Sequence, residues 1–240
     1  MEVFSRRSFV ATAAAGIATF ASAGSIPSSA QTNHTELKTE WNFAAFDAIV
    51  HRPAQVKQLF DSVSASIWLM AHVLNSLNSL QFGFGLAPDQ IQLVAVSRGP
   101  STLIDFDDYV WKTYNLGTLF KINDPTTGKP AERNIFYAGS PATANSTHSS
   151  NDVNDPGSIF NNDRSMQTLQ QRGVQFLCCH NSVVGLMNEI IEQNHLKQTQ
   201  EQVYGDVVAH LLPGTMMVPA AVGAMAFLQS KGGYGYTYIS

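Results

Sequence analysis

The only two cysteines of this 240-residue chain, Cys178 and Cys179, are adjacent, and their thiols are the first candidates for chemistry. Consecutive Cα atoms lie about 3.8 Å apart, whereas an ordinary disulfide spans roughly 4.4–6.8 Å, so a bond between the two would be strained. The pair ends the apolar run 174–177 and precedes a His-Asn-Ser sequence at 180–182. The arrangement predicts reactive thiol chemistry or buried packing, and not a stabilising crosslink.

Cys179 is the better candidate for a functional thiol because it comes last in a predicted strand, 174–179. Alternation along a strand places the two thiols on opposite faces of the sheet. If Asn181 or Ser182 caps a following helix, free backbone N–H groups lie near Cys179 and favour a thiolate, and His180 favours it further. The competing interpretation is that both cysteines only pack, since free cysteine is among the most buried residue types.

Three of the seven histidines, His51, His72 and His180, are candidates to line a site or bind a metal. His51 follows the predicted strand 41–50, and ligands of α/β proteins bind at the carboxyl ends of strands. His72 lies within a predicted helix, where packing is the expected role. No CxxC, CxxCH or HxxxH spacing occurs, which excludes a covalent c-type haem and leaves a metal enzyme as the weakest option. The sequence identifies no cofactor.

The turn 97–101, Ser-Arg-Gly-Pro-Ser, joins a predicted strand to a predicted helix. Arg98 and the backbone amides from Gly99 onward are suited to hold an anion at the start of that helix. The plainer alternative is a tight turn with no ligand. Neither a P-loop nor a strand-linked GxGxxG motif occurs, so the sequence indicates no nucleotide site.

Alternating helices and strands must position these residues. This order predicts an α/β fold in layers, with a mainly parallel sheet of about five strands and right-handed crossovers. Three tyrosines that alternate along the last strand are expected to pack under a helix or at a subunit contact. The predicted elements are strand 41–50, helix 54–80, strand 91–96, helix 101–114, helix 166–172, strand 174–179, helix 183–188, helix 199–212, strand 215–218, helix 222–231 and a strand within 234–239.

Two segments stand outside this alternation. Residues 121–165 are rich in Asn, Asp, Ser, Thr, Pro and Gly and predict a long polar surface insertion. Residues 1–30 predict a twin-arginine signal peptide, with Ser-Arg-Arg-Ser-Phe-Val at 5–10 and an Ala-rich core at 11–23. The mature protein, 31–240, is expected to be a single domain that is periplasmic or otherwise exported.

Composition excludes two function classes. The formal net charge is −4 and only 13% of residues are charged, so the basic surface that binds nucleic acid is missing. After the signal, no apolar run reaches the roughly 18 residues of a membrane span, so no membrane partner is expected after cleavage.

Four blocks of sequence, which follow one another in the order found in that family, resemble the DsrE/DsrF-like proteins over about residues 43–120 and 166–239. This resemblance implies a three-layer α/β/α sandwich that assembles into trimers or hexamers. In sulfur-relay members, a single cysteine near a strand end accepts sulfane sulfur as a persulfide and passes it to another cysteine. Cys179 best matches their Cys-x-Asn pattern, whereas Cys178, the export signal and the insertion depart from it. The blocks are HVLNSL at 72–77, VAVSRGP at 94–100, GVQFLCCHNS at 173–182, and LPGTMMVPA at 212–220 running into GGYGY at 232–236.

The sequence therefore supports two functional hypotheses more strongly than a metal enzyme. The first is an exported sulfur carrier or exchange protein that uses Cys179, with His180, Asn181 and His51 shaping the pocket and a thiol protein as sulfur donor or acceptor. The second is a non-catalytic module for small-ligand binding or oligomeric assembly, with the insertion as lid or contact. Either is expected to be a homo-oligomer.

Overall fold

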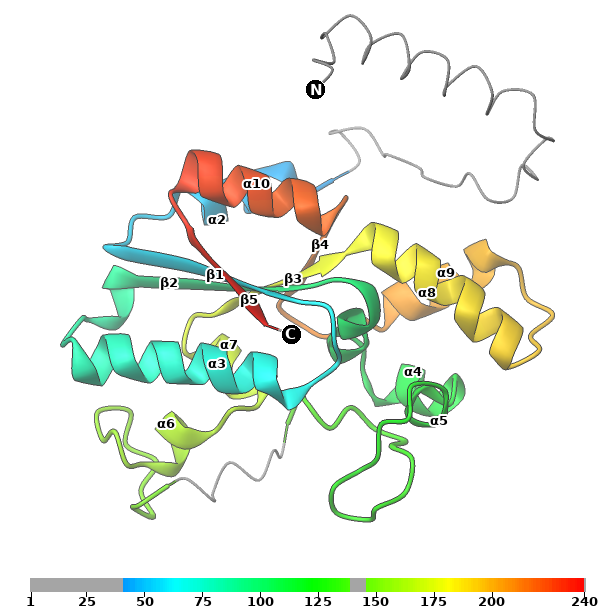
Figure 1. The fold of residues 1–240 in the computed structure, drawn as a ribbon, viewed down its shortest axis with the longest axis horizontal. Coiled ribbons are helices and arrows are strands. Elements are labelled where there is room, and N and C mark those ends of the chain that lie inside the picture. The colour runs from blue at the N-terminus through cyan, green and yellow to red at the C-terminus, as the bar shows by residue number, and fades with distance from the viewer. Residues whose placement is uncertain (1–40, 139–145, 240) are drawn as a thin grey trace, which may run out of the picture. The chain divides into compact units, whose positions relative to one another are not determined.

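The computed structural model describes residues 41–138 and 146–239 (Figure 1). The predicted signal peptide, 1–30, lies outside the described residues. Within the described part, no helix is both long enough and apolar enough to cross a membrane.

A five-stranded parallel sheet forms the middle layer, in the order β4-β3-β2-β1-β5. The predicted α/β fold with a parallel sheet of about five strands is thereby confirmed. The chain steps from β1 to β4 in one direction, and β5 then returns to the other side of β1. The strands are β1 Val56–Ser62, β2 Ile91–Ser97, β3 Gln175–Cys179, β4 Thr215–Val218 and β5 Gly235–Ile239.

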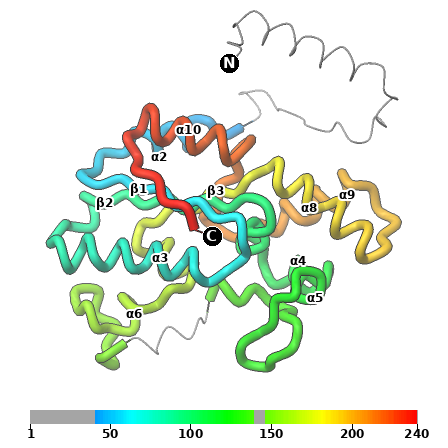
Figure 2. Tube along the Cα trace, in the orientation of Figure 1, coloured from blue at the N-terminus to red at the C-terminus, as the bar shows by residue number. Residues whose placement is uncertain are grey.

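Helices cover both faces of the sheet. Helices α2 (Phe43–His51) and α10 (Ala221–Gly232) lie side by side on one face (Figures 1 and 2). The opposite core contains side chains of α3 (Ile67–Asn78), α8 (His180–Gln193) and α9 (Gln200–Ala209). We call these the α2/α10 face and the α3 face. Every residue of β2 is buried, as expected for a central strand between two cores.

The first predicted strand, 41–50, is wrong: this segment is helix α2. Asn42 caps the helix, since its side-chain oxygen accepts a hydrogen bond from the Ala45 N–H at 3.1 Å. Phe46, Ile49 and Val50 are the buried residues, at the i, i+3, i+4 spacing of one helical face. A short apolar run does not distinguish strand from helix, and here the cap and the spacing favour the helix.

The predicted helix 54–80 is also wrong in its first third, which forms β1. Seven residues of β1 pair in parallel with β2, from Val56 opposite Ile91 to Ser62 opposite Ser97. Helix α3 starts only after Ser66, whose hydroxyl accepts a hydrogen bond from the Trp68 N–H at 3.2 Å. Tertiary pairing with a central strand outweighs the weak helical period of the segment.

The later predictions are confirmed to within a few residues, apart from helix 101–114, which is split in two, and helix 183–188, which is the middle of the longer α8. The remaining helices are the π-helix Ser79–Gly83, the 3₁₀ helices Pro88–Gln90 and Gly99–Asp105, and the α-helices α4 Asp108–Thr113, α5 Leu116–Leu119, α6 Ile159–Asn162 and α7 Met166–Gln171.

The polar insertion, 121–165, is not only a surface segment. Asn134 is buried, and its side-chain amide donates to the carbonyls of Ile104 at 2.8 Å and Phe106 at 2.6 Å. Ala131 lies against Gly117, where an added Cβ would stand 2.3 Å from the Ala131 backbone nitrogen and oxygen. The glycine is therefore required for close approach of the insertion to the body.

We predict that Gly117→Ala lowers the free energy of unfolding by about 1–3 kcal/mol, the usual cost of overpacking a tight site. Urea denaturation measures this change. Gly185→Ala is the matched control, because a Cβ there meets nothing within 4 Å and α8 gains an alanine. Equal stability of the two variants would contradict the close approach at Gly117.

Candidate functional site

The carboxyl edge of the sheet brings together most of the residues that the sequence singles out. One row of paired residues crosses four strands there, with Ser62 beside Ser97, Ser97 beside Cys178, and Cys178 beside Met217. Cys179 comes one position later, opposite Val218. This edge is where open α/β sheets place their ligands.

Cys179 points into the core of the α2/α10 face, as the alternation predicts. Its side chain belongs to a residue only 5% exposed. The sulfur accepts a hydrogen bond from the backbone N–H of Ala221 at 3.3 Å, at the first residue of α10. Ala220, the N-cap residue of α10, contributes no side-chain cap, so the thiol takes that role.

The helix that approaches the sulfur is therefore not the one that was expected. Helix α8 begins at His180, with Cys179 as its N-cap residue, so the prediction of a cap at Asn181 or Ser182 is wrong. The reason is alternation: the Cys179 side chain leaves β3 on the α2/α10 face, whereas α8 packs into the opposite core.

Cys178 is fully buried on the α3 face, near Ser97 and Asp105. The Ser97 hydroxyl donates to Oδ2 of Asp105, while Oδ1 is buried and makes no hydrogen bond of normal geometry with the described residues. Burial raises the pKa of Asp105 to about 7, and the Ser97 hydroxyl and Cys178 thiol partly oppose that rise. Burial, with the nearby Asp105 charge, raises the pKa of the Cys178 thiol well above its usual value, so Cys178 is a protonated packing residue.

His180 is buried at the start of α8. Its Nδ1 lies 2.7 Å from the hydroxyl of Tyr204 in α9, and its ring meets that of Trp41 edge-on at 5.3 Å. These contacts fix the imidazole beside the strand end. Asn181, the next residue of α8, is exposed.

His51 does not reach this edge, and its predicted role in the site is wrong. It ends helix α2 and is exposed, with Nδ1 3.2 Å from the carboxylate of Asp47. The chain then runs into the start of β1, so His51 lies at the amino edge of the sheet. The error follows directly from the assignment of 41–50 as a strand. His72 is exposed on α3, with its ring 6.4 Å from that of the exposed Trp68, so the packing role expected for it is wrong.

Arg98 is held by an ion pair within the fold. Its Nε and Nη2 donate to the two carboxylate oxygens of Asp61 at 2.8 and 3.0 Å, and Asp61 is fully buried. The Tyr236 hydroxyl donates to the same carboxylate at 2.7 Å. The hydrogen bonds to Asp61 raise the pKa of Arg98, so it is permanently charged.

Gly99 also serves the fold. It has a φ of 56°, in the left-handed region, and its N–H donates to the Ser182 hydroxyl of α8 at 2.8 Å. The Ser101 hydroxyl donates to the Ser62 carbonyl at 2.6 Å. Arg98 and the Gly99 N–H, two of the donors proposed for an anion, already have partners, which favours the plainer alternative of a tight turn.

Sequence reasoning missed Asp61 and Asp105, the two buried carboxylates at this edge. Each sits inside an apolar run, in LFDS at 59–62 and LIDF at 103–106. An acid in such a run is the signal that would have identified them, because a buried carboxylate needs a partner or a proton.

Neither a metal-binding cluster nor a related protein identifies the chemistry of this site. Among the described residues, no group of three or more His, Cys, Asp or Glu side chains lies close enough to hold a metal ion. No protein-family model, no curated protein and no solved structure matches this chain. The resemblance to DsrE/DsrF-like proteins stays a prediction from sequence.

We predict that Asp105 makes stability depend on pH. The unfolded pKa is about 3.9, so its rise to about 7 in the folded state means that folding is favoured below pH 4 and that this contribution is lost as pH rises to about 7. The loss is limited to about 4 kcal/mol. Urea denaturation from pH 4 to 8 should show a flatter profile for Asp105→Asn.

The control for this prediction is Glu201→Gln, which removes an exposed carboxylate at the start of α9. Its profile should follow the unmodified protein. A profile of Asp105→Asn as steep as that of the control would mean that Asp105 keeps an ordinary pKa.

Proposed function

We propose that this protein is an exported DsrE-like sulfur carrier that accepts and passes on sulfur at Cys179. The observation that supports this most directly is the hydrogen bond from the Ala221 N–H to the Cys179 sulfur at 3.3 Å. That N–H begins a 12-residue helix, and the positive end of a helix dipole favours a negatively charged sulfur.

The proposed chemistry needs no oxidant. The Cys179 thiolate attacks the outer sulfur of a donor persulfide, the donor S–S bond breaks, and the donor leaves as a thiolate. The product is a persulfide on Cys179. An acceptor thiolate then attacks the outer sulfur, and the Cys179 thiolate leaves and regains the Ala221 N–H.

Access of the sulfur donor to Cys179 limits the proposed reaction. Cys179 is 5% exposed and packs with Val218, Ala221 and Met225 in the core of the α2/α10 face. The donor must therefore reach the sulfur through an opening of this layer at the carboxyl edge. A small inorganic polysulfide should react faster than a bulky aromatic disulfide.

Location and partners are part of the same proposal. The twin-arginine segment at 5–10 lies outside the described residues and supports export of the folded protein. The resemblance supports a homo-oligomer, a trimer or hexamer, and a thiol protein as sulfur donor or acceptor.

We predict that polysulfide adds one sulfur atom to the protein and that the addition depends on Cys179. Intact-mass spectrometry should show this mass increase for the unmodified protein and for Cys178→Ser, and none for Cys179→Ser. Reduction should remove it. An adduct that persists in Cys179→Ser, or its absence from the unmodified folded protein, would refute the proposal.

A non-catalytic assembly module is the second candidate, and the open edge of the sheet at β5 favours it. Tyr236 and Tyr238 of β5 are 47% and 49% exposed, whereas Tyr234 is buried and donates to the Ile49 carbonyl at 2.7 Å. An exposed edge strand presents unpaired backbone groups on which another copy can pair.

For this candidate we predict that Tyr238→Lys lowers the oligomeric state, because edge lysines oppose strand pairing. Light scattering after size exclusion measures the mass. Phe84→Lys is the control, since Phe84 is 75% exposed and lies outside β5. Loss of assembly with unchanged sulfur uptake would separate the two functions, and an unchanged mass would remove β5 as the interface.

A further inference from the structure

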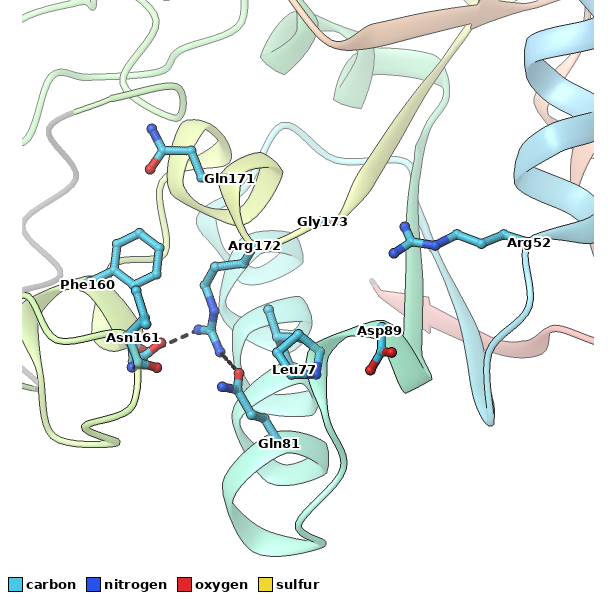
Figure 3. Close-up of a pocket in the computed structure, with 11 residues that line it drawn as sticks. Arg52, Leu77, Gln81, Asp89, Phe160, Asn161, Gln171, Arg172 and Gly173 are labelled. Atoms are coloured by element: carbon cyan, nitrogen blue, oxygen red, sulfur yellow. Dashed lines mark hydrogen bonds between the residues drawn. The ribbon is translucent and has the colours of Figure 1, made fainter.

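A pocket lies at the amino edge of the sheet, opposite the Cys179 edge (Figure 3). Its volume is about 350 Å³, within the range of small-ligand sites. Arg52 precedes β1, Asp89 precedes β2, and Gly173 precedes β3, so three strand starts contribute to the wall. The proposed sulfur chemistry does not use this pocket.

The most informative residue of the pocket is Arg172, whose guanidinium contacts only neutral oxygens. It donates to the Asn78 side chain at 2.8 Å, the Asn161 carbonyl at 3.3 Å and the Gln81 side chain at 3.0 Å. It forms no ion pair with any carboxylate of the described residues. Burial lowers the pKa of Arg172 to about 10, which still leaves it charged at neutral pH.

A largely buried charge without a counter-ion is unfavourable, and an anion in the pocket would relieve it. A guanidinium has five N–H donors, and three hydrogen bonds to the described residues leave two donors for a ligand. The fork geometry of arginine matches the two oxygens of a carboxylate.

The rest of the wall sets the size and charge of that anion. Arg52 extends toward the pocket from the end of α2, on the side opposite Arg172 (Figure 3). Two arginines and one acid, Asp89, leave one net positive charge. Leu77 and Phe160 supply apolar surface. A singly charged ligand with an apolar body therefore fits better than a phosphate dianion.

We propose that this pocket binds a small monocarboxylate with an apolar body, whose carboxylate is held by Arg172. Val153 and Phe160 belong to the insertion, and Leu77 belongs to α3. A bound ligand would therefore link the insertion to the body of the protein, which gives the second half of the insertion a binding role.

Titration calorimetry with the mature protein tests the proposal, with the series from butanoate to octanoate and benzoate as probes. At least one probe should bind, and its neutral primary amide should bind about tenfold or more weakly, because it loses a charged hydrogen bond. Arg172→Lys should weaken binding by a similar factor, since lysine keeps the charge and loses the fork.

A second pair of variants protects the test against misfolding at Arg172. Val153→Asp places a negative charge on an exposed wall residue of the pocket and should abolish binding. Val222→Asp makes the same change at an exposed residue of α10 and should leave binding unaltered. No binding by any probe, equal binding of acid and amide, tighter binding of inorganic phosphate, or equal effects of the two aspartates would overturn the proposal.

Discussion

The parallel pairing of β1 with β2, with both faces of the sheet covered, is the constraint on which the rest of the structure depends. Because both faces are buried, alternate residues of each strand enter different cores: Leu93 faces α3, and Val94 faces α2 and α10. The same alternation separates Cys178 from Cys179. The alternation of side chains along β3 thus places the two cysteine thiols in different cores, on opposite faces of the sheet.

The two faces satisfy their buried carboxylates in different ways at the carboxyl edge. Asp61 has a counter-ion, Arg98, and a hydroxyl donor, Tyr236. Among the described residues, the Asp105 carboxylate meets the Ser97 hydroxyl and the Cys178 thiol but no counter-ion, and burial raises its pKa to about 7. The ion pair and the tyrosine join β1 and β5 to Arg98, the residue after β2. The hydrogen bond of Asp105 instead joins the last residue of the 3₁₀ helix to Ser97 at the end of β2.

Sequence reasoning succeeded where local signals and burial agree. The run 91–96 is apolar, rich in β-branched residues and ended by Gly-Pro, and it is the central strand. It failed for 41–62, where short apolar runs fit both periods. The Asn42 cap makes 43–51 a helix, whereas pairing with β2 makes 56–62 a strand. For the site, alternation correctly placed the two thiols on opposite faces of the sheet. It could not identify the hydrogen-bond partner of Cys179, because Ala221 lies 42 residues away along the chain. Arg172 gave no local signal, because its pocket is assembled from separate segments.

The geometry of β3 is compatible with both parts of the proposed function, export and a free thiol at Cys179. In an oxidising compartment, two cysteines normally form a disulfide. Cys178 and Cys179 point into opposite cores, so a bond between them would require β3 to leave the sheet. Burial of Cys179 further limits oxidation by solvent reagents. Under the proposed function, the low exposure that would slow sulfur uptake would also protect the thiol from oxidation, so a small sulfur donor is the reagent that the proposal requires.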